Sequence, residues 1–346
     1  MKNTVKSKQD LFGKYDLENR RYLGCKSKLL PWIKDLLNEH TKGNSLFDVF
    51  AGTGVVTKYM LEKYDSFIIN DFLFSNNIIY KAFFGSETYD SEKLLSIKNE
   101  FSFIKPEPKK SNYFSDNFGG RYFSEGDAKI IGDIREKIEN SNNLNIRERA
   151  ILIASLIYSC DRIANTVGHY GAYLKKDKIL DRFRFELINP LDTSHKKIQV
   201  FREDSNELAD KVFADIAFID PPYNSRQYSR IYHVLETLVK WDKSELRGRT
   251  KKPEPENLSS YSKSNAPKAF DDLVHHLKCN YMITTYNNTY SSKKRSSNNK
   301  ISYTAILSSL KDVGSTQVFE KPYRVFDAGK TNLKNHKERV FITKAG

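Results

Sequence analysis

The stretch that decides the fold is IAFIDPPYNSRQY, residues 216–228. Its apolar start, residues 216–219, predicts a buried strand. That strand stops after Asp220, because Pro221 and Pro222 lack the N–H that a strand needs and fix the backbone angle φ. Ligands bind at the carboxyl ends of strands in open α/β sheets. The stretch therefore predicts a strand that ends in a site.

The chemistry of this predicted site suits transfer to an amino nitrogen that is conjugated to a ring. Such a nitrogen is a poor nucleophile, because its lone pair is delocalised into the ring. The Asp220 carboxylate and the Pro221 carbonyl can each accept one N–H bond, which draws the nitrogen toward tetrahedral geometry and frees the lone pair. Tyr223 can stack on the ring. An aspartate that caps a turn above a packed tyrosine explains the same residues, and the motif alone leaves both interpretations open.

Residues 220–223 resemble the D-P-P-Y motif of S-adenosylmethionine-dependent DNA adenine-N6 methyltransferases. The following residues 224–228 are similar to an extension found in restriction–modification members of that family. The resemblance implies four catalytic residues, which are Asp220, Pro221, Pro222 and Tyr223. It also implies DNA contacts from the extension, at Arg226, Gln227 and Tyr228.

A glycine turn follows an earlier predicted strand. The strand Ser45–Phe50 runs into DVFAGTG, residues 48–54, and a helix is expected over Val55–Tyr64. Glycines at such a turn let a ligand approach the backbone, and the helix N-terminus favours negative charge. The next predicted strand, Phe67–Asn70, ends in Asp71, 17 residues past Gly54, where an acid can bind both ribose hydroxyls of an adenosine-containing cofactor. The third glycine of a dinucleotide fingerprint is absent, which argues against NAD and for S-adenosylmethionine.

The resemblance extends to this turn and to a segment near the N-terminus. Residues 50–54 match the family's F-x-G-x-G motif, and Asp71 matches its ribose-binding acid. Tyr22, Gly24 and Lys26 match the Y-x-G-x-K motif, in which the aromatic ring and the lysine border the methionine part of the cofactor. A simple Tyr-Leu-Gly turn with solvated basic residues is the alternative for this segment.

A further acid, Asp204, follows the predicted strand Ile198–Arg202 and is positioned to bind the amino group of the cofactor's adenine. The cofactor-binding residues that we predict are Tyr22, Lys26, Asp48, Phe50, Ala51, Gly52, Thr53, Gly54, Asp71, Phe72, Asp204 and Ser205.

The segment 86–195 interrupts the alternation of strands and helices. After a helix over Ser75–Phe84, the segment is mainly helical, with helices expected at Ala128–Ile138 and Ile146–Ala164. Residues 105–110 are typical of an exposed linker, and Asn112–Tyr122 of a loop. We therefore predict an arm (1–20), a catalytic domain (21–85 and 196–346) and a helical target-recognition insert (86–195).

The end of the second insert helix carries residues suited to nucleic acid. The helix end and the loop that follows it carry Arg162, Asn165, His169 and Tyr170. Such side chains contact bases and phosphates well. The alternative is a helix terminus capped by Asn165 and Gly168, with the tyrosines packed as core. The segment resembles an R-x-N-x-x-G-x-[FY] element of the family's recognition insert, which implies contacts near the target base.

The remaining chain completes the predicted sheet. An amphipathic helix, Tyr228–Trp241, is expected to pack back on the sheet. Residues 242–267 are polar and basic, and are equally consistent with a mobile loop that contacts DNA through Lys251 and Lys252 or with a solvated linker. A strand over Tyr281–Tyr286 precedes the basic run 293–295. Two short segments, 317–319 and 339–343, predict a final antiparallel hairpin.

Composition narrows the class of protein. The net charge of +14 favours a polyanionic partner, and double-stranded DNA fits best. Three widely spaced cysteines without a C-x-x-C pattern suggest neither disulfides nor zinc, so a reduced cytoplasm is expected. The paired His275 and His276 have no spaced partner, so no metal is expected. No apolar run approaches the roughly 18 residues that a membrane helix needs.

The order of the motifs resembles the α group of amino-methyltransferases. It implies an α/β, Rossmann-like class I methyltransferase fold, with a mostly parallel seven-stranded sheet, a C-terminal antiparallel hairpin and the helical insert. We expect a monomeric DNA adenine-N6 methyltransferase that uses S-adenosylmethionine, extrudes its target base and works beside a restriction endonuclease. Methylation of RNA adenine or of protein glutamine, and a catalytically silent DNA-binding module, are the alternatives.

Overall fold

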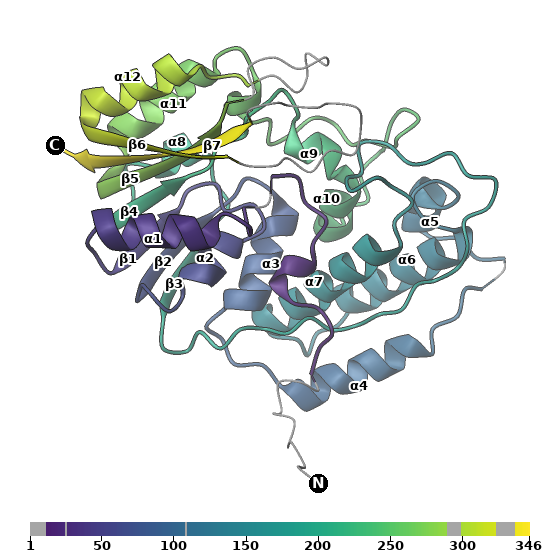
Figure 1. The fold of residues 1–346 in the computed structure, drawn as a ribbon. Coiled ribbons are helices and arrows are strands. Elements are labelled where there is room, and N and C mark those ends of the chain that lie inside the picture. Colours follow the sequence, from purple (N-terminus) through teal and green to yellow (C-terminus); the bar gives the residue numbers. More distant parts are fainter. Residues whose placement is uncertain (1–11, 25, 108, 289–298, 323–335) are drawn as a thin grey trace, which may run out of the picture. The chain divides into compact units, whose positions relative to one another are not determined.

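The computed structural model describes residues 12–24, 26–107, 109–288, 299–322 and 336–346 (Figure 1). The predicted basic run 293–295 lies outside these residues. The chain forms two compact units, each assembled from three separate segments. We call them the helical unit (Met1–Cys25, Leu73–Ser194 and Ser229–Glu256) and the sheet unit (Lys26–Phe72, His195–Tyr228 and Asn257–Gly346).

The sheet unit is built on seven strands in the order β3-β2-β1-β4-β5-β7-β6. The strands are β1 (Ser45–Asp48), β2 (Ser66–Asn70), β3 (Lys197–Phe201), β4 (Phe213–Ile219), β5 (Lys278–Asn287), β6 (Gly314–Pro322) and β7 (Lys337–Ala345). The first five are parallel, and β7 runs antiparallel to both of its neighbours, β5 and β6. This arrangement confirms the predicted fold class, including the C-terminal hairpin.

The order in which the chain adds strands to the sheet reverses direction between β1 and β4. From β1 the chain proceeds outward through β2 and β3, and it then returns to place β4 on the other side of β1. The register sets Asp48, the last residue of β1, beside Phe218 of β4. Such a switch point leaves a crevice at the carboxyl ends of the two strands, where α/β proteins bind ligands. Both Asp220 and the glycine turn 50–54 follow these strand ends.

Helices cover the sheet on both faces. They are α1 (Leu30–His40), α2 (Val55–Met60), α8 (Ser205–Leu208), α11 (Ala266–His276) and α12 (Tyr303–Val313). Figure 1 shows α11 and α12 together on one face and α1 and α2 on the other. Helix α2 ends at Met60, four residues before its predicted end, because a turn at Lys63 and the burial of Tyr64 redirect the chain into β2.

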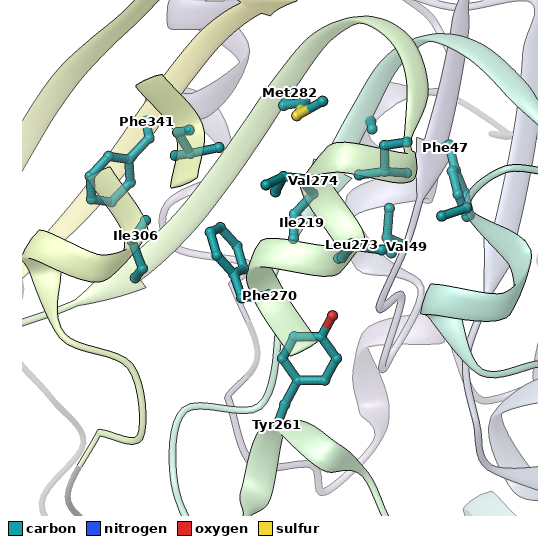
Figure 2. Close-up of a cluster of buried hydrophobic side chains, with 14 of the residues drawn as sticks. Phe47, Val49, Ile219, Tyr261, Phe270, Leu273, Val274, Met282, Ile306 and Phe341 are labelled. Atoms are coloured by element: carbon teal, nitrogen blue, oxygen red, sulfur yellow. The ribbon is translucent and has the colours of Figure 1, made fainter. Parts of the chain in front are cut away.

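The core of the sheet unit lies under α11 and α12 (Figure 2). Phe270 and Leu273 of α11 are fully buried against strand residues such as Ile219 and Met282. Burial of each such side chain stabilises the fold by about 1.5–3 kcal/mol. Ile219 is therefore fixed by packing, and the residue that follows it, Asp220, has a defined position.

The helical unit is organised around one helix. Its helices are α3 (Phe74–Phe84), α4 (Ser91–Ser102), α5 (Tyr113–Phe118), α6 (Glu125–Glu139), α7 (Ile146–Ile163) and α10 (His233–Lys240). Of the 18 residues of α7, all but Ile146, Arg149 and Arg162 are buried, so the helix is surrounded on nearly all sides. Helices α3, α6 and α10 pack against it.

The predicted loop Asn112–Tyr122 is wrong, because residues 113–118 form helix α5. Asn112 is the N-cap, and its side chain accepts a hydrogen bond from the Ser115 N–H at 3.0 Å. Phe114 and Phe118 are fully buried. The sequence also failed to predict α4, which begins after the N-cap Asp90.

The predicted helix Tyr228–Trp241 is also wrong in part. It divides into α9 (Tyr228–Ile231) and α10, and α10 packs on α3 and α7 instead of on the sheet. The reason is Glu236, whose carboxylate accepts hydrogen bonds from the first backbone N–H groups of α3, at Phe74 and Ser75. Residues 73–85 and Ser229–Glu256 lie in the helical unit, and the predicted boundaries of the catalytic domain stay a prediction. The role of the insert in target recognition remains a prediction.

Candidate active site

Asp220 is the first residue after β4, and three groups converge on its carboxylate. Oδ1 accepts hydrogen bonds from the Thr285 hydroxyl at 2.7 Å and from the Tyr223 hydroxyl at 2.5 Å. The Lys26 ammonium lies 3.3 Å from the same oxygen. Pro221 and Pro222 turn the chain away from the sheet, as the sequence predicts, so the carboxylate stands at the strand end.

Tyr223 is held in place by both its ring and its backbone. Its ring centroid lies 4.6 Å from that of Tyr286, and its carbonyl accepts a hydrogen bond from the Lys300 N–H at 2.8 Å. The Lys26 ammonium donates to the Tyr223 hydroxyl and lies 4.5 Å from the centroid of its ring. The ring is thus fixed beside Asp220, while its stacking on a target base stays a prediction.

Lys26 lies between two carboxylates. It is 5% exposed, and its ammonium is 3.3 Å from Asp220 and 3.6 Å from Glu338. The sequence predicted Lys26 as a site residue, but it gave no reason to select Thr285 or Glu338. Thr285 follows Thr284, which pairs with Ile219, and Glu338 lies in β7, on the far side of β5.

The charges at this cluster influence one another. Burial raises the pKa of the Asp220 carboxyl, and the nearby Lys26 ammonium only partly offsets this. Burial alone lowers the pKa of Lys26, but Asp220 and Glu338 more than compensate, so the pKa lies above its usual value. Burial also opposes ionisation of Glu338, yet Lys26 and His336 hold the pKa of its carboxyl below the ordinary value. Lys26 therefore stays charged.

The glycine turn lies at the end of β1. Gly52 and Gly54 have φ angles of 55° and 77°, which an L side chain rarely adopts. The Gly52 N–H donates to Asp71 Oδ2 at 3.0 Å, and the Ala51 N–H donates to the Asn70 carbonyl at 2.9 Å. The turn thus holds the predicted ribose-binding acid Asp71 next to two positions whose backbone conformation favours glycine.

Asp48 is 1% exposed, and only one of its two carboxylate oxygens has a hydrogen-bond partner among the described residues. Its Oδ2 accepts a hydrogen bond from the Thr57 hydroxyl at 2.8 Å, whereas Oδ1 is buried without a partner among the described residues. Burial raises the pKa of Asp48 to about 7, against the Thr57 hydrogen bond and with a further contribution from the Asp220 charge. A buried acceptor without a partner suits a cationic group of a ligand.

Asn70, which the sequence did not single out, ties the end of β2 to α8. Its side-chain NH₂ lies 3.1 Å from the Glu203 carbonyl and 3.2 Å from the Ser205 hydroxyl. Ser205 in turn donates to the Val49 carbonyl, and Asp204 caps α8 by accepting from the Asn206 N–H. The Ser205 hydroxyl therefore has structural partners, and the contacts of Ser205 and Asp204 with the cofactor stay predictions.

The other predicted cofactor residues surround the turn. Ala51 and Thr53 are buried, and Phe72 is half-buried directly after Asp71. The Phe50 ring meets the edge of Tyr261, with 4.9 Å between centroids.

A family model of D12 class N6 adenine-specific DNA methyltransferases matches residues 22–295. This match covers most of the chain. The chain belongs to this family.

Curated relatives of this chain carry names that agree with the family. Modification methylase StsI of Streptococcus sanguinis is 34% identical over 287 residues, which are 78% of this chain and 44% of the relative. Modification methylase LlaI of Lactococcus lactis subsp. lactis is 32% identical, over 78% of this chain and 46% of the relative. Type II methyltransferase M.NlaIII of Neisseria lactamica is 27% identical, over 91% of this chain and 95% of the relative. The chain spans about half the length of the first two.

The helical unit holds Tyr22. Its ring stacks on that of Tyr232, with centroids 4.9 Å apart and planes 8° from parallel, and the Leu23 N–H donates to the Tyr232 hydroxyl. Gly24 has a φ of 86°, as the predicted turn requires. The role of Tyr22 beside the cofactor stays a prediction.

Two of the predicted DNA contacts are internal to the helical unit. Asn165 is 3% exposed, and its NH₂ donates to the carbonyls of Arg121 and Leu174 at 2.9 and 2.8 Å. Tyr170 is 2% exposed and donates to Asp161 at 2.8 Å. For these two residues the packing interpretation describes the structure. Arg162 is exposed and His169 is half-buried, so their contact with DNA stays a prediction.

The extension after the D-P-P-Y motif is half-buried in the sheet unit. The Gln227 side chain makes two hydrogen bonds with the Ser259 backbone, at 2.9 and 2.8 Å. The Arg226 carbonyl accepts from the Ser262 hydroxyl, and Tyr228 is the first residue of α9. The extension therefore holds residues 259–262 beside the motif, and its contact with DNA stays a prediction.

Lys251 and Lys252 lie in a turn of the helical unit and are half-buried. Burial, and to a lesser degree Arg230, lowers the pKa of Lys252. The neighbouring Arg247 is paired with Glu245 and Glu254. Much of the positive charge of this turn is thus already compensated.

No helix among the described residues is long and apolar enough to span a bilayer. Within the same residues, no three side chains of the types His, Cys, Asp and Glu gather in a way that would hold a metal ion.

Proposed function

We propose that this chain transfers a methyl group from S-adenosylmethionine to the N6 nitrogen of adenine in a short sequence of duplex DNA. The observation that carries the proposal is the convergence of several hydrogen-bond donors on the Asp220 carboxylate. It accepts from Thr285 and Tyr223 and faces the Lys26 ammonium at the end of β4. An adenine amino group is a donor of the same kind, and it can take the position of one of these groups.

The residues act on the nitrogen in two ways. The Asp220 carboxylate and the Pro221 carbonyl accept its hydrogens, which withdraws the lone pair from the ring and points it at the methyl group. The Tyr223 ring, fixed against Tyr286, offers a face on which the base can stack. Since a paired base cannot reach a strand-end pocket, the target adenine has to leave the duplex.

The residues at the glycine turn fit the cofactor. S-adenosylmethionine supplies an electrophilic methyl group when it is bound. The buried Oδ1 of Asp48, which has no partner among the described residues, suits its cationic ammonium group. Gly52 and Gly54 carry no side chain that would hinder its approach to the turn. Asp71 and Asp204 are the residues that we assign to its ribose and its adenine, respectively.

Duplex DNA is supported by an exposed basic segment of the helical unit, residues 174–184. All five of its basic side chains are exposed: Lys175, Lys176, Lys178, Arg182 and Arg184. Four of them, all but Arg182, form no ion pair or hydrogen bond with any described residue. Because these charges are exposed and no internal pair has to be broken, they are better placed for phosphates than the half-buried Lys251 and Lys252.

The segment is also held in a fixed course. The Asp127 carboxylate accepts hydrogen bonds from the backbone N–H groups of Arg182 and Phe183 at 2.9 and 3.0 Å. At the other end the Leu174 N–H donates to the Asn165 carbonyl, and Asn165 returns a bond to the Leu174 carbonyl. Asn165 therefore supports DNA binding through the backbone it anchors.

The biological setting that we propose is a restriction–modification system, with a restriction endonuclease of the same specificity as functional partner. The names of the relatives, modification methylases and a Type II methyltransferase, support this setting. We propose a monomer in the cytoplasm, and sequencing of methylated DNA from an expressing host identifies the recognition site.

The substrate is tested with labelled S-adenosylmethionine and three acceptors, which are duplex DNA, RNA and protein. We expect label in duplex DNA alone, at adenine. Label in RNA or in protein glutamine would replace DNA by one of the alternative substrates. DNA binding without transfer to any acceptor would identify a catalytically silent module.

A further inference from the structure

The second carboxylate beside Lys26 has no assigned role. Glu338 is 5% exposed, and its Oε2 is buried with no hydrogen-bond partner among the described residues. The Lys26 ammonium lies 3.6 Å from this oxygen, just beyond hydrogen-bond distance. The other oxygen, Oε1, lies 3.8 Å from His336 Nε2. Glu338 thus presents an unfilled acceptor to a lysine that is already engaged elsewhere.

The first carboxylate, in contrast, is crowded. Asp220 Oδ1 accepts from Thr285 and Tyr223 and is 3.3 Å from the Lys26 ammonium, although a carboxylate oxygen has two lone pairs. Asp220 Oδ2 accepts from none of the described residues, so an amino group has to compete with these three donors where it binds Oδ1. Thr285 is fixed in β5 and Tyr223 by its packing, whereas Lys26 has a flexible side chain and a second acceptor within reach.

We propose that Glu338 is a positioning residue, which receives the Lys26 ammonium when the amino group of the substrate binds Asp220 at Oδ1. Lys26 alternates between the two carboxylates. In the structure the Lys26 ammonium contacts Asp220, and a small movement brings the ammonium within hydrogen-bond distance of Glu338 Oε2. The exchange leaves each buried charge with a partner in both states, whereas expulsion of the ammonium without Glu338 would leave it uncompensated. No covalent bond or proton has to be transferred.

This inference rests on the proposed function only in assuming an amino nitrogen as acceptor. It applies equally to adenine in DNA, adenine in RNA or the amide of glutamine. The comparison below is therefore made on whichever acceptor the wild-type protein methylates. Wild-type activity on RNA or protein alone would refute the DNA proposal and still leave this inference open to the same test.

The test is Glu338→Gln, which keeps the size of the side chain and removes its charge. We expect the methyl-transfer rate at saturating cofactor to fall about tenfold to a hundredfold, with cofactor affinity unchanged in calorimetry. A fluorescent 2-aminopurine at the target position should show less base extrusion when the acceptor is DNA. Glu320→Gln in the neighbouring β6 is the matched control, because Glu320 pairs with Lys337 and Arg339 at the edge of the same hairpin.

A double-mutant cycle with Lys26→Met separates positioning from general structural damage. If Glu338 acts by receiving Lys26, its substitution costs nothing further once the ammonium is gone. Equal losses from Glu338→Gln in both backgrounds would overturn the inference, and so would a wild-type rate of the single variant. If Glu338→Gln melts below the assay temperature, Glu338→Asp serves instead. It keeps the charge but shortens the reach, and we expect an intermediate loss that again vanishes with Lys26→Met.

Discussion

Thr285 offers a sharp test of the site, because its neighbour Thr284 is a natural control. Thr285 donates a 2.7 Å hydrogen bond to the Asp220 carboxylate. Thr284 is equally buried, but its hydroxyl has no partner among the described residues. Replacement of either threonine by valine preserves the shape of β5, so the two variants differ in the loss of one hydrogen bond to Asp220.

A hydrogen bond to a charged group is worth about 1.5–3 kcal/mol. Since Tyr223 and Lys26 still contact the same oxygen, we expect the lower value for Thr285→Val, which corresponds to a roughly tenfold slower transfer. The Thr285 hydrogen bond also lowers the pKa of Asp220, because it favours the charged form. Without it, the loss of activity on acidification should begin at a higher pH.

The assay is single-turnover transfer with excess enzyme, measured across the pH range for wild type, Thr285→Val and Thr284→Val. Thr284→Val should match wild type in rate and in pH profile. A Thr285→Val protein with the rate and profile of Thr284→Val would refute the role of Asp220 as the acceptor that Thr285 supports. An equal loss in both variants would show instead that β5 tolerates no substitution here.

Three further predictions concern the cofactor, the fold and DNA. Asp71→Ala should weaken S-adenosylmethionine binding in calorimetry at an unchanged melting temperature, and unchanged affinity would remove Asp71 from the ribose site. Asp48 has a raised pKa in the folded state, so without cofactor the fold loses stability as the pH rises from the ordinary carboxyl range to about 7. Asp48→Asn should therefore gain more thermal stability over wild type at pH 8 than at pH 5, and a constant difference would contradict the burial effect. Replacement of Lys175 and Lys176 by glutamine should reduce the salt dependence of DNA binding by about two units of slope. The same replacement of Lys251 and Lys252, in the turn 243–252, should reduce it less. The reverse order would assign the phosphate contacts to that turn.

Several parts of the site follow from local sequence. The strand before Asp220 is a short apolar run that two prolines end, and both features depend only on adjacent residues. The glycine turn is predictable for the same reason, because positive φ angles at Gly52 and Gly54 are a property of the residue type. The mostly parallel sheet and its final antiparallel hairpin follow from these local elements together with the family resemblance, whereas the order of the strands was not predicted.

The remaining parts depend on pairing between distant segments. Thr285 and Glu338 reach Asp220 and Lys26 through the register of β4, β5 and β7, which a single sequence does not reveal. Asn165 has the polar side chain of a surface residue, yet it is buried because the distant Arg121 carbonyl accepts its N–H. Helix α5 escaped prediction because its N-cap, Asn112, is also a typical loop residue.

The most direct test of Asp220 as the centre of adenine methylation is the position of the methyl group. Duplex DNA is incubated with wild type and with Asp220→Ala, digested to nucleosides and analysed by mass spectrometry, while cofactor binding is measured by calorimetry. We expect N6-methyladenine from wild type and none above background from Asp220→Ala, which should still bind S-adenosylmethionine. A methyl group on cytosine, or N6-methyladenine from Asp220→Ala at the wild-type rate, would contradict the proposed chemistry.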